Sequence, residues 1–274
     1  MGNEGKNGKV PLISKIAYGF GDVGCNFSWM FVSNFLMIFY TDVFGISMAA
    51  VSALMLFSRF WDAINDPIVG GLTDKTKTRW GKSRPWFLFG AVPFAVAAFL
   101  AFSVPDISPD GKLLYAYATY IFLSFMYTVV NIPLASILPT LTDDMNERTV
   151  LATWRKFLAF LGSSIVSATA LTLVQVTGRG NEALGFRIVM GMFGIVGCVC
   201  FFLTFFLVRE NNLQENIKSA TLKEMIMSLG KNTPWKVFAI NIMFMWTGYF
   251  LQSSALVYYY KYYIGSTSCL LYTS

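Results

Sequence analysis

The chain of 274 residues is 55% hydrophobic and only 13% charged, with a mean hydropathy of +0.54, which is too apolar for an ordinary soluble domain. Its formal net charge of +6 comes from Lys and Arg residues dispersed over short segments beside hydrophobic stretches, a pattern that argues against a nucleic-acid-binding protein. The sequence contains no His and therefore lacks the usual ligands of a zinc or haem site, so we expect no cofactor.

Seven hydrophobic stretches follow one another along the chain. Each is long enough to cross the hydrocarbon core of a bilayer, which takes about 20 helical residues at 1.5 Å per residue. Together they predict an all-α integral membrane protein. The expected spanning helices are residues 16–41, 47–73, 86–105, 113–139, 150–177, 186–208 and 235–263.

The distribution of Lys and Arg predicts the orientation of these spans. If the N-terminus lies in the cytoplasm, the basic segment DKTKTRWGKSRP (74–85) and most other Lys and Arg residues also lie on the cytoplasmic side, where such residues are enriched. The exceptions on the outer side are Lys112, Arg179, Arg187 and Lys261. We therefore expect a cytoplasmic N-terminus.

The polar segment between the sixth and seventh spans predicts a division into two bundles. It is mixed in charge and carries Leu222, Met225, Ile226 and Leu229 at helical spacing, which is typical of an amphipathic cytoplasmic linker. Six helices, a linker and a further helix indicate a two-bundle transporter. The expected divisions are a six-helix bundle (1–208), the linker (209–234) and the first helix of a second bundle (235–265).

The last residues differ in character from the rest of the chain. CLLYTS (269–274) matches the translated end of a transposon used to prepare sequencing libraries. We therefore interpret residues 266–274 as a non-native tail and leave them out of the fold prediction. On this interpretation the natural protein continues beyond Gly265.

Asp62 and Asp66 lie in FWDAINDP (60–67), inside the second expected span, where a charge costs on the order of 3 kcal/mol to insert. Because they are four residues apart, both carboxylates project from one face of a helix. Two such groups in a low-dielectric setting cannot both stay ionised without a cation between them or a proton on one. The spacing predicts a coupling-ion site, and the alternative is a structural ion pair between Asp62 and Arg59, one turn earlier.

The fourth expected span carries a polar stripe at the same spacing. Its members are Ser124, Tyr127, Thr128 and Asn131, followed by Pro133. Hydroxyl and amide oxygens are hard ligands, so the stripe favours Na⁺ or Li⁺ over a softer metal. Hydrogen bonding between helices is the alternative interpretation.

The first expected span places polar and aromatic side chains on one face: Tyr18, Asp22, Asn26 and Trp29. Such a set suits a sugar, since hydroxyls take polar partners and the apolar face of the ring stacks on an aromatic plate. Arg155 of the fifth span could complete the pocket as a fork-shaped donor. Alternatively, Arg155 snorkels toward the membrane interface.

Several ordered blocks carry a resemblance to a known family. Gly71 to Pro85 resembles the signature loop between helices two and three of the major facilitator superfamily. Further blocks are similar to the glycoside-pentoside-hexuronide:cation symporters: YGFGDVGCNF (18–27), FYTDVFGIS (39–47), SRFWDAINDPIVG (58–70), TRWGKSRPW (78–86) and YTVVNIPLASILP (127–139). The likeness covers about residues 12–263 and implies a twelve-helix fold, of which this chain holds the first six helices and the seventh.

The resemblance also implies site residues. It places Asp62, Asp66, Thr128 and Asn131 at the cation site, and Asn26, Tyr127 and Arg155 at sugar-contact positions. In melibiose-carrying members a Lys-Asp pair stands at Cys25 and Asn26, an Asp at Asn131 and a Trp at Ala135. These departures argue against melibiose, and the GDVGCNF and NIPLAS forms are more similar to the xyloside and glucuronide branch.

Residues and resemblance together predict a symporter that imports a xyloside, a short xylo-oligosaccharide or a glucuronide with Na⁺, Li⁺ or H⁺ by alternating access. The sugar would contact Asp22, Asn26, Trp29, Tyr127 and Arg155. We expect a monomer in the lipid of a bacterial inner membrane, with no nucleic-acid partner and no metal beyond the coupling cation. Two alternatives remain: an intramembrane aspartyl enzyme, because GFGD (19–22) matches its GxGD core, and a sugar sensor that does not transport.

Overall fold

A computed structural model describes residues 10–210, 227–228 and 230–259. Within these ranges the regular structure is helical, apart from one isolated bridge between Thr78 and Gly81. The chain forms two compact units, Met1–Ile217 and Lys218–Ser274, and each is described by itself. The hydrophobic residues predicted on the linker, and the predicted tail at 266–274, lie outside the described residues.

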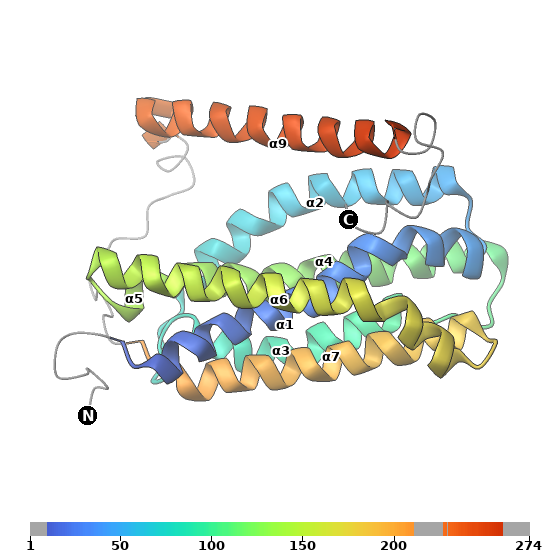
Figure 1. The fold of residues 1–274 in the computed structure, drawn as a ribbon, viewed down its shortest axis with the longest axis horizontal. Coiled ribbons are helices and arrows are strands. Elements are labelled where there is room, and N and C mark those ends of the chain that lie inside the picture. The colour runs from blue at the N-terminus through green and yellow to red at the C-terminus, as the bar shows by residue number, and fades with distance from the viewer. Residues whose placement is uncertain (1–9, 211–226, 229, 260–274) are drawn as a thin grey trace. The chain divides into compact units, whose positions relative to one another are not determined.

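The helices of the first unit run roughly along one long direction (Figure 1). They follow the predicted spans closely, so the all-α prediction is confirmed. Their bounds are α1 (Leu12–Ile38), a π-helical continuation η1 (Phe39–Val43), α2 (Met48–Lys75), α3 (Arg84–Ala101), α4 (Pro109–Ser136), α5 (Leu138–Leu141), α6 (Met145–Gly178) and α7 (Glu182–Leu207). The second unit contains α9 (Thr233–Tyr259).

Five helices in the described part of the chain are long and apolar enough to cross a membrane: Leu12–Val43, Arg84–Ala101, Gly111–Ser136, Met145–Gly178 and Glu182–Leu207. The predicted spans at α2 and α9 are not among them. In α2 the reason is chemical, because Arg59, Asp62 and Asp66 lie in the middle of the helix and lower its hydropathy. The charged residues that single out α2 are therefore the same ones that suggest function.

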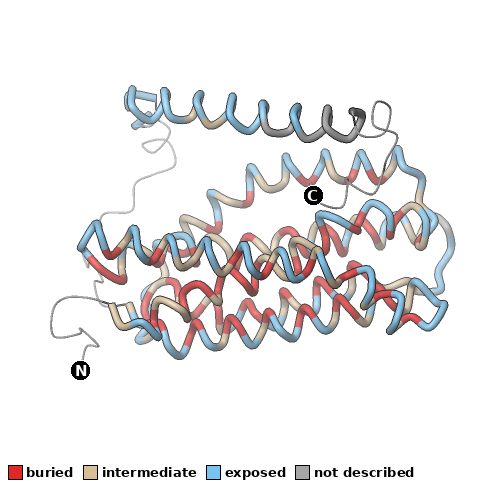
Figure 2. Tube along the Cα trace, in the orientation of Figure 1, coloured by how far each residue is buried: buried red, intermediate tan, exposed pale blue. Residues whose placement is uncertain are grey.

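Helix α1 lies at the centre of the first unit, where it packs against α6 and α7, while α3 packs between α4 and α7. Figure 2 shows the buried positions concentrated along α1, α3 and α7, with α2 buried on one side only. Helices α1 and α7 cross very closely, since a Cβ added to Gly24 or to Gly197 would lie 3.1 Å from the carbonyl oxygen of the other glycine. Glycine allows this approach because it has no side chain.

The helix ends are set by capping side chains and prolines, which a hydropathy profile does not detect. Ser47 caps α2 by accepting from the backbone N–H of Ala50 at 3.3 Å, and Asp144 caps α6 by accepting from Asn146 at 2.8 Å. The fourth predicted span stops at Ser136 instead of running to Pro139, because Pro139 lies at the start of the separate short helix α5. Hydropathy thus located the spans, and caps and prolines set their ends.

The ends of α3 and α7 cap each other. The Glu210 carboxylate, just after α7, accepts hydrogen bonds from the backbone N–H groups of Lys82, Ser83 and Arg84 at 2.9, 2.8 and 3.1 Å. In return the Arg84 guanidinium donates from Nε and Nη2 to the carbonyl oxygen of Phe205 at 3.0 and 2.6 Å. A carboxylate at a helix N-terminus and a guanidinium at a C-terminus both complement the helix dipoles. We call the pair Glu210 and Arg84 the α3–α7 clamp.

Replacing Glu210 with Ala should destabilise the first unit by about 2 kcal/mol, since the α3 N-terminus loses its cap. In a unit of this size the unfolding temperature should then fall by about 4–8 °C. Thermal unfolding of the purified protein in detergent, followed by tryptophan fluorescence, measures the change. The control is Asp106→Ala, an acidic residue in an exposed loop. Equal unfolding temperatures for the two variants would contradict the role of the clamp.

Candidate functional site

Asp62 and Asp66 face α4 and are held there by hydroxyl groups. Helix α2 packs on α4, and on α4 Ser124 and Thr128 are four residues apart, which matches the spacing of the two acids. Ser124 Oγ donates a hydrogen bond to Asp62 Oδ1, and Thr128 Oγ1 donates to Asp66 Oδ1 at 2.9 Å. Both carboxylates therefore point between the helices rather than toward lipid. These two hydrogen bonds use only the Oδ1 atom of each carboxylate.

Arg59 is a weak partner for this pair. Its Nη1 lies 4.0 Å from Asp62 Oδ2, and its side chain is 71% exposed, whereas that of Asp62 is 24% exposed. A long ion pair with one exposed member contributes at most about 1 kcal/mol. Among the described residues no salt bridge joins Asp66 to a Lys or Arg. The alternative of a structural ion pair thus accounts for one acid at most, and two carboxyl groups face a single, weakly paired guanidinium.

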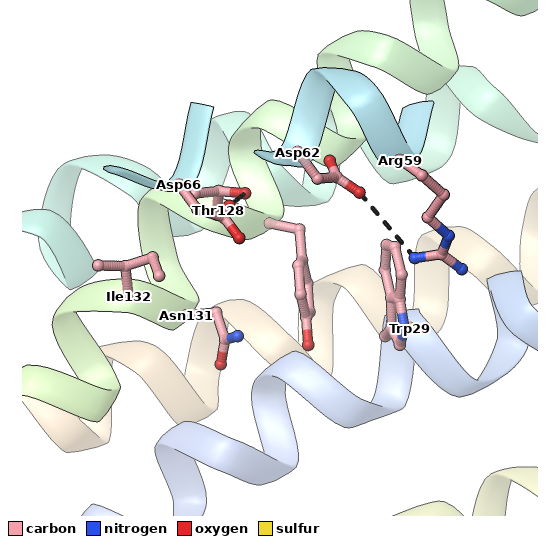
Figure 3. A pocket seen from close by; sticks show the side chains of 8 residues that line it. Trp29, Arg59, Asp62, Asp66, Thr128, Asn131 and Ile132 are labelled. Atoms are coloured by element: carbon pink, nitrogen blue, oxygen red, sulfur yellow. Dashed lines mark hydrogen bonds and ion pairs between the residues drawn. The ribbon is translucent and has the colours of Figure 1, made fainter. Parts of the chain in front are cut away.

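A pocket of about 310 Å³ opens beside these acids, between α1, α2 and α4 (Figure 3). One wall is aromatic, because Trp29 of α1 stacks on Tyr127 of α4 with their ring centroids 4.2 Å apart and their planes 23° from parallel. The opposite wall carries the carboxylates. The pocket is lined by Trp29, Arg59, Asp62, Asp66, Tyr127, Thr128, Asn131 and Ile132.

The structure brings together six of the nine residues that the sequence predicted as cation or sugar contacts. Those six line the pocket: Trp29, Asp62, Asp66, Tyr127, Thr128 and Asn131. The prediction left Ile132 out, named Arg59 only as a possible ion-pair partner, and placed the hydrogen-bond donor Ser124 in the polar stripe but not among the cation contacts. Ser124 could have been included, because it stands one turn before Thr128 in the same stripe. Ile132 offers no polar signal that would reveal it.

The other three predicted residues, Asp22, Asn26 and Arg155, form a second cluster between α1 and α6. Arg155 Nη2 donates to Asp22 Oδ1 at 3.0 Å, and Asn26 Nδ2 donates to the backbone oxygen of Asp22 at 2.7 Å. Arg155 Nη1 also lies 3.4 Å from the hydroxyl of Tyr18. The Arg155 side chain is 16% exposed and that of Asp22 is 5% exposed. Arg155 therefore points into the bundle, and the snorkelling alternative is wrong.

The two clusters share one helix face. Asp22, Asn26 and Trp29 follow one another along α1 at spacings of four and three, so Trp29 stands two turns, about 10 Å, from Asp22. Trp29 stacks on Tyr127, and both line the pocket that also holds Asp62 and Asp66. The aromatic wall of the pocket thus lies between the acid pair on α2 and the ion pair of α1 and α6.

A family described as MFS/sugar transport protein has a model that matches residues 17–272 of this chain. The chain belongs to this family. Membership accounts for the apolar helices and confirms that this is a membrane protein with part of a major facilitator fold. It also confirms the resemblance carried by the loop from Gly71 to Pro85 and by the blocks around Asp62 and Asn131.

Relatives within the MFS/sugar transport family are transporters rather than enzymes, so the interpretation of GFGD as an aspartyl-enzyme motif is not supported. An isoprimeverose transporter of Lactiplantibacillus pentosus is 41% identical over 92% of this chain and 53% of its own length. A protein of Escherichia coli strain K12 provisionally named a glycoside/cation symporter is 38% identical over 97% and 59%. A glucuronide carrier protein homolog of the same organism is 32% identical over 92% and 55%. The chain spans about half the length of these relatives.

Proposed function

We propose that the complete protein is a cation-coupled sugar symporter that imports a neutral or acidic glycoside by alternating access. The observation that carries the proposal is the pair Asp62 and Asp66, each bonded to a hydroxyl of α4 beside a pocket with a stacked aromatic wall. Carboxylates inside a membrane helix are costly, so those that occur there mark ion or proton pathways by default. Relatives named as glycoside, isoprimeverose and glucuronide carriers support a sugar as the cargo.

The coupling ion would sit between the acids and α4. Asp62, Asp66, Thr128 and Asn131 offer carboxylate, hydroxyl and amide oxygens, which suit a hard cation such as Na⁺ or Li⁺. A proton shared by the two acids would meet the same electrostatic need, since it removes one of the two negative charges. Either ion offsets charge that Arg59 leaves uncompensated.

The sugar would bind against the aromatic wall. Trp29 and Tyr127 cover one face of each other, so the outer face of one ring would take a pyranose face. Asn26, Asp22 and Arg155, which lie outside the lining of this pocket, would provide polar groups for hydroxyls. The pocket volume of about 310 Å³ lies at the lower end of the range of about 300–1,000 Å³ for small-molecule sites. A pentose-based glycoside such as a xyloside fits this size better than a longer oligosaccharide.

The wider organisation is also proposed. Residues 1–208 would form the first bundle, residues 209–234 a cytoplasmic linker, and residues 235–265 the first helix of a second bundle. The positive-inside rule favours a cytoplasmic N-terminus in the inner membrane of a bacterium. We propose a monomer, because a two-bundle transporter completes its pocket within one chain.

Coupling predicts reciprocal effects of sugar and cation. If the cation raises sugar affinity by a given factor, the sugar must raise cation affinity by the same factor, typically about 5–150-fold. Titrating a p-nitrophenyl xyloside into the complete purified protein with and without Na⁺, Li⁺ or acid, and then the ion with and without the sugar, measures both factors. Sugar affinity that is identical under all ionic conditions would contradict coupled symport.

A further inference from the structure

We propose that the surface where α3 begins and α7 ends binds an anionic phospholipid, with the headgroup phosphate on Arg79 and Lys82 and an acyl chain against Phe89 and Phe206. The inference goes beyond sugar transport, because this surface lies apart from the pocket. The residues that line the pocket come from α1, α2 and α4 only. Helix α2 packs mainly on α4, and α3 and α7 lie on the opposite side of α1 from α2 (Figure 1).

A tight turn before α3 holds Arg79 and Trp80 at its tip. Thr78 closes the turn, because its carbonyl oxygen accepts from the N–H of Gly81 at 3.1 Å and its hydroxyl donates to the carbonyl oxygen of Gly81 at 2.9 Å. Gly81 has a φ of 109°, which favours glycine. The guanidinium carbon of Arg79 lies 4.6 Å from the centroid of the Trp80 ring, and the Arg79 side chain is exposed. The turn therefore presents a cation on an aromatic plate.

Trp80 connects this turn to the apolar surface of two helices. Its ring centroid lies 6.5 Å from that of Phe89 on α3 and 5.9 Å from that of Phe205 on α7, and Phe205 contacts Phe206 at 5.1 Å. Phe89 and Phe206 are 66% and 65% exposed. Because α3 and α7 are long and apolar enough to cross a membrane, their exposed rings lie against acyl chains rather than water. The cation of the turn and the lipid-facing phenylalanines thus belong to one continuous surface.

This end of the first unit is strongly positive. Residues 74–84 and 209–210 hold six basic side chains against two acidic ones, Asp74 and Glu210. The Glu210 carboxylate is already bonded to three backbone N–H groups in the α3–α7 clamp, and Arg84 is bonded there too. Among the described residues, no salt bridge joins any of the other five basic side chains to an acid. These cations are therefore available to a phosphate oxygen.

A phospholipid fits this surface better than a soluble anion does. A free phosphate needs cations alone and makes no use of exposed phenylalanines. A phospholipid brings its phosphate and its acyl chains together, in the same order as the basic turn and the apolar helices below it. Basic clusters beside membrane helices bind anionic headgroups, and Trp is enriched at headgroup level. Phe89 stands five residues into α3, about 7 Å below its first residue, which matches the depth of the boundary between headgroups and acyl chains.

The experiment compares two lipids that carry the same brominated acyl chains, phosphatidylglycerol and phosphatidylcholine. Each is titrated into the complete protein in maltoside micelles, and binding is followed by the quenching of tryptophan fluorescence, since bromine quenches at short range. We expect phosphatidylglycerol to bind about 20-fold more tightly, because each basic side chain at a membrane surface contributes about fivefold. Arg79→Gln should lower this preference about fivefold. Lys82→Gln should do the same, while the backbone N–H of Lys82 still binds Glu210.

Two further variants serve as controls. Arg187→Gln removes an exposed Arg from the other end of α7 and should leave the preference unchanged. Arg79→Lys keeps the charge and should retain the preference, which separates the loss of charge from the loss of folding. Glycerol phosphate, which is the headgroup without acyl chains, should not displace the lipid at equal concentration, because it lacks the chains that Phe89 and Phe206 would contact.

Three results would overturn the inference. Equal binding of the two lipids by the wild type means that this surface is covered or does not select charge. Equal losses in Arg79→Gln and Arg187→Gln mean that net charge acts without a site. Displacement of the lipid by glycerol phosphate at equal concentration means that the surface is a site for a soluble anion. The sugar and the coupling ion take no part in this experiment, so its failure would leave the proposed function untouched.

Discussion

Replacing Asp66 with Asn in the complete protein is expected to abolish cation-stimulated sugar uptake while the protein still folds. Asn keeps the shape of the side chain and can still accept the hydrogen bond from Thr128, which is 2.9 Å long in the structure. It removes the negative charge, and removing one partner of a buried charge pair costs about 3 kcal/mol, or on the order of 100-fold in cation affinity. Uptake of labelled sugar into vesicles, measured against Na⁺ or Li⁺ concentration, tests the effect.

The matched control is Asp74→Asn, which neutralises an exposed acid in the last turn of the same helix. Asp74 does not line the pocket, so neutralising its side chain should leave the cation stimulation of sugar uptake as it is in the wild type. Full cation stimulation in the Asp66 variant would remove Asp66 from the ion site. Equal losses in both variants would mean that any charge change on α2 impairs transport, and would contradict a specific site.

Replacing Gly185 with Ala should be the most destabilising of the glycine substitutions in the hairpin of α6 and α7. A Cβ at Gly185 would collide with the carbonyl oxygen of Val174, and it would lie 3.0 Å from the Cγ1 atom of the same residue. Backbone cannot rotate away as a side chain can, so the two helices must separate. Overpacking of this kind costs about 3 kcal/mol and should lower the unfolding temperature by about 6–12 °C.

The control for this substitution is Gly71→Ala on α2, where an added Cβ meets nothing within 4 Å. Alanine is the better helix former by about 1 kcal/mol, so this variant should unfold at the same temperature as the wild type or higher. Thermal unfolding of both purified variants in one detergent decides the matter. An unfolding temperature of Gly185→Ala equal to that of the wild type would contradict the close contact between α6 and α7.

The positions of the helices could be predicted from the sequence because hydropathy is a local property. Their ends and their irregular parts could not. The residue that follows the π-helical turn η1 has a partner far along the chain, because the ammonium of Lys112, near the start of α4, donates to the carbonyl oxygen of Phe44 at 3.2 Å. The α3–α7 clamp joins Glu210 to residues more than a hundred positions earlier. No periodicity in either segment reports such a contact.

The candidate site could also be predicted only in part from the sequence. The spacing of Asp62 and Asp66 on α2, and of Ser124 and Thr128 on α4, is visible in the sequence and predicts that each pair shares a helix face. That the two faces meet in register depends on how α2 packs against α4, which the sequence alone does not give. The pairing of Asp22 with Arg155, 133 positions apart, was open for the same reason.

The α3–α7 clamp also constrains how α3 and α7 can move relative to each other. Glu210 is the residue just before position 211, and three N–H groups at the start of α3 hold its carboxylate. Glu210 lies just after α7, so its hydrogen bonds tie the end of α7 to the start of α3. A tilt of one of these helices would therefore be transmitted to the other. The clamp makes this end of the two helices a single mechanical element.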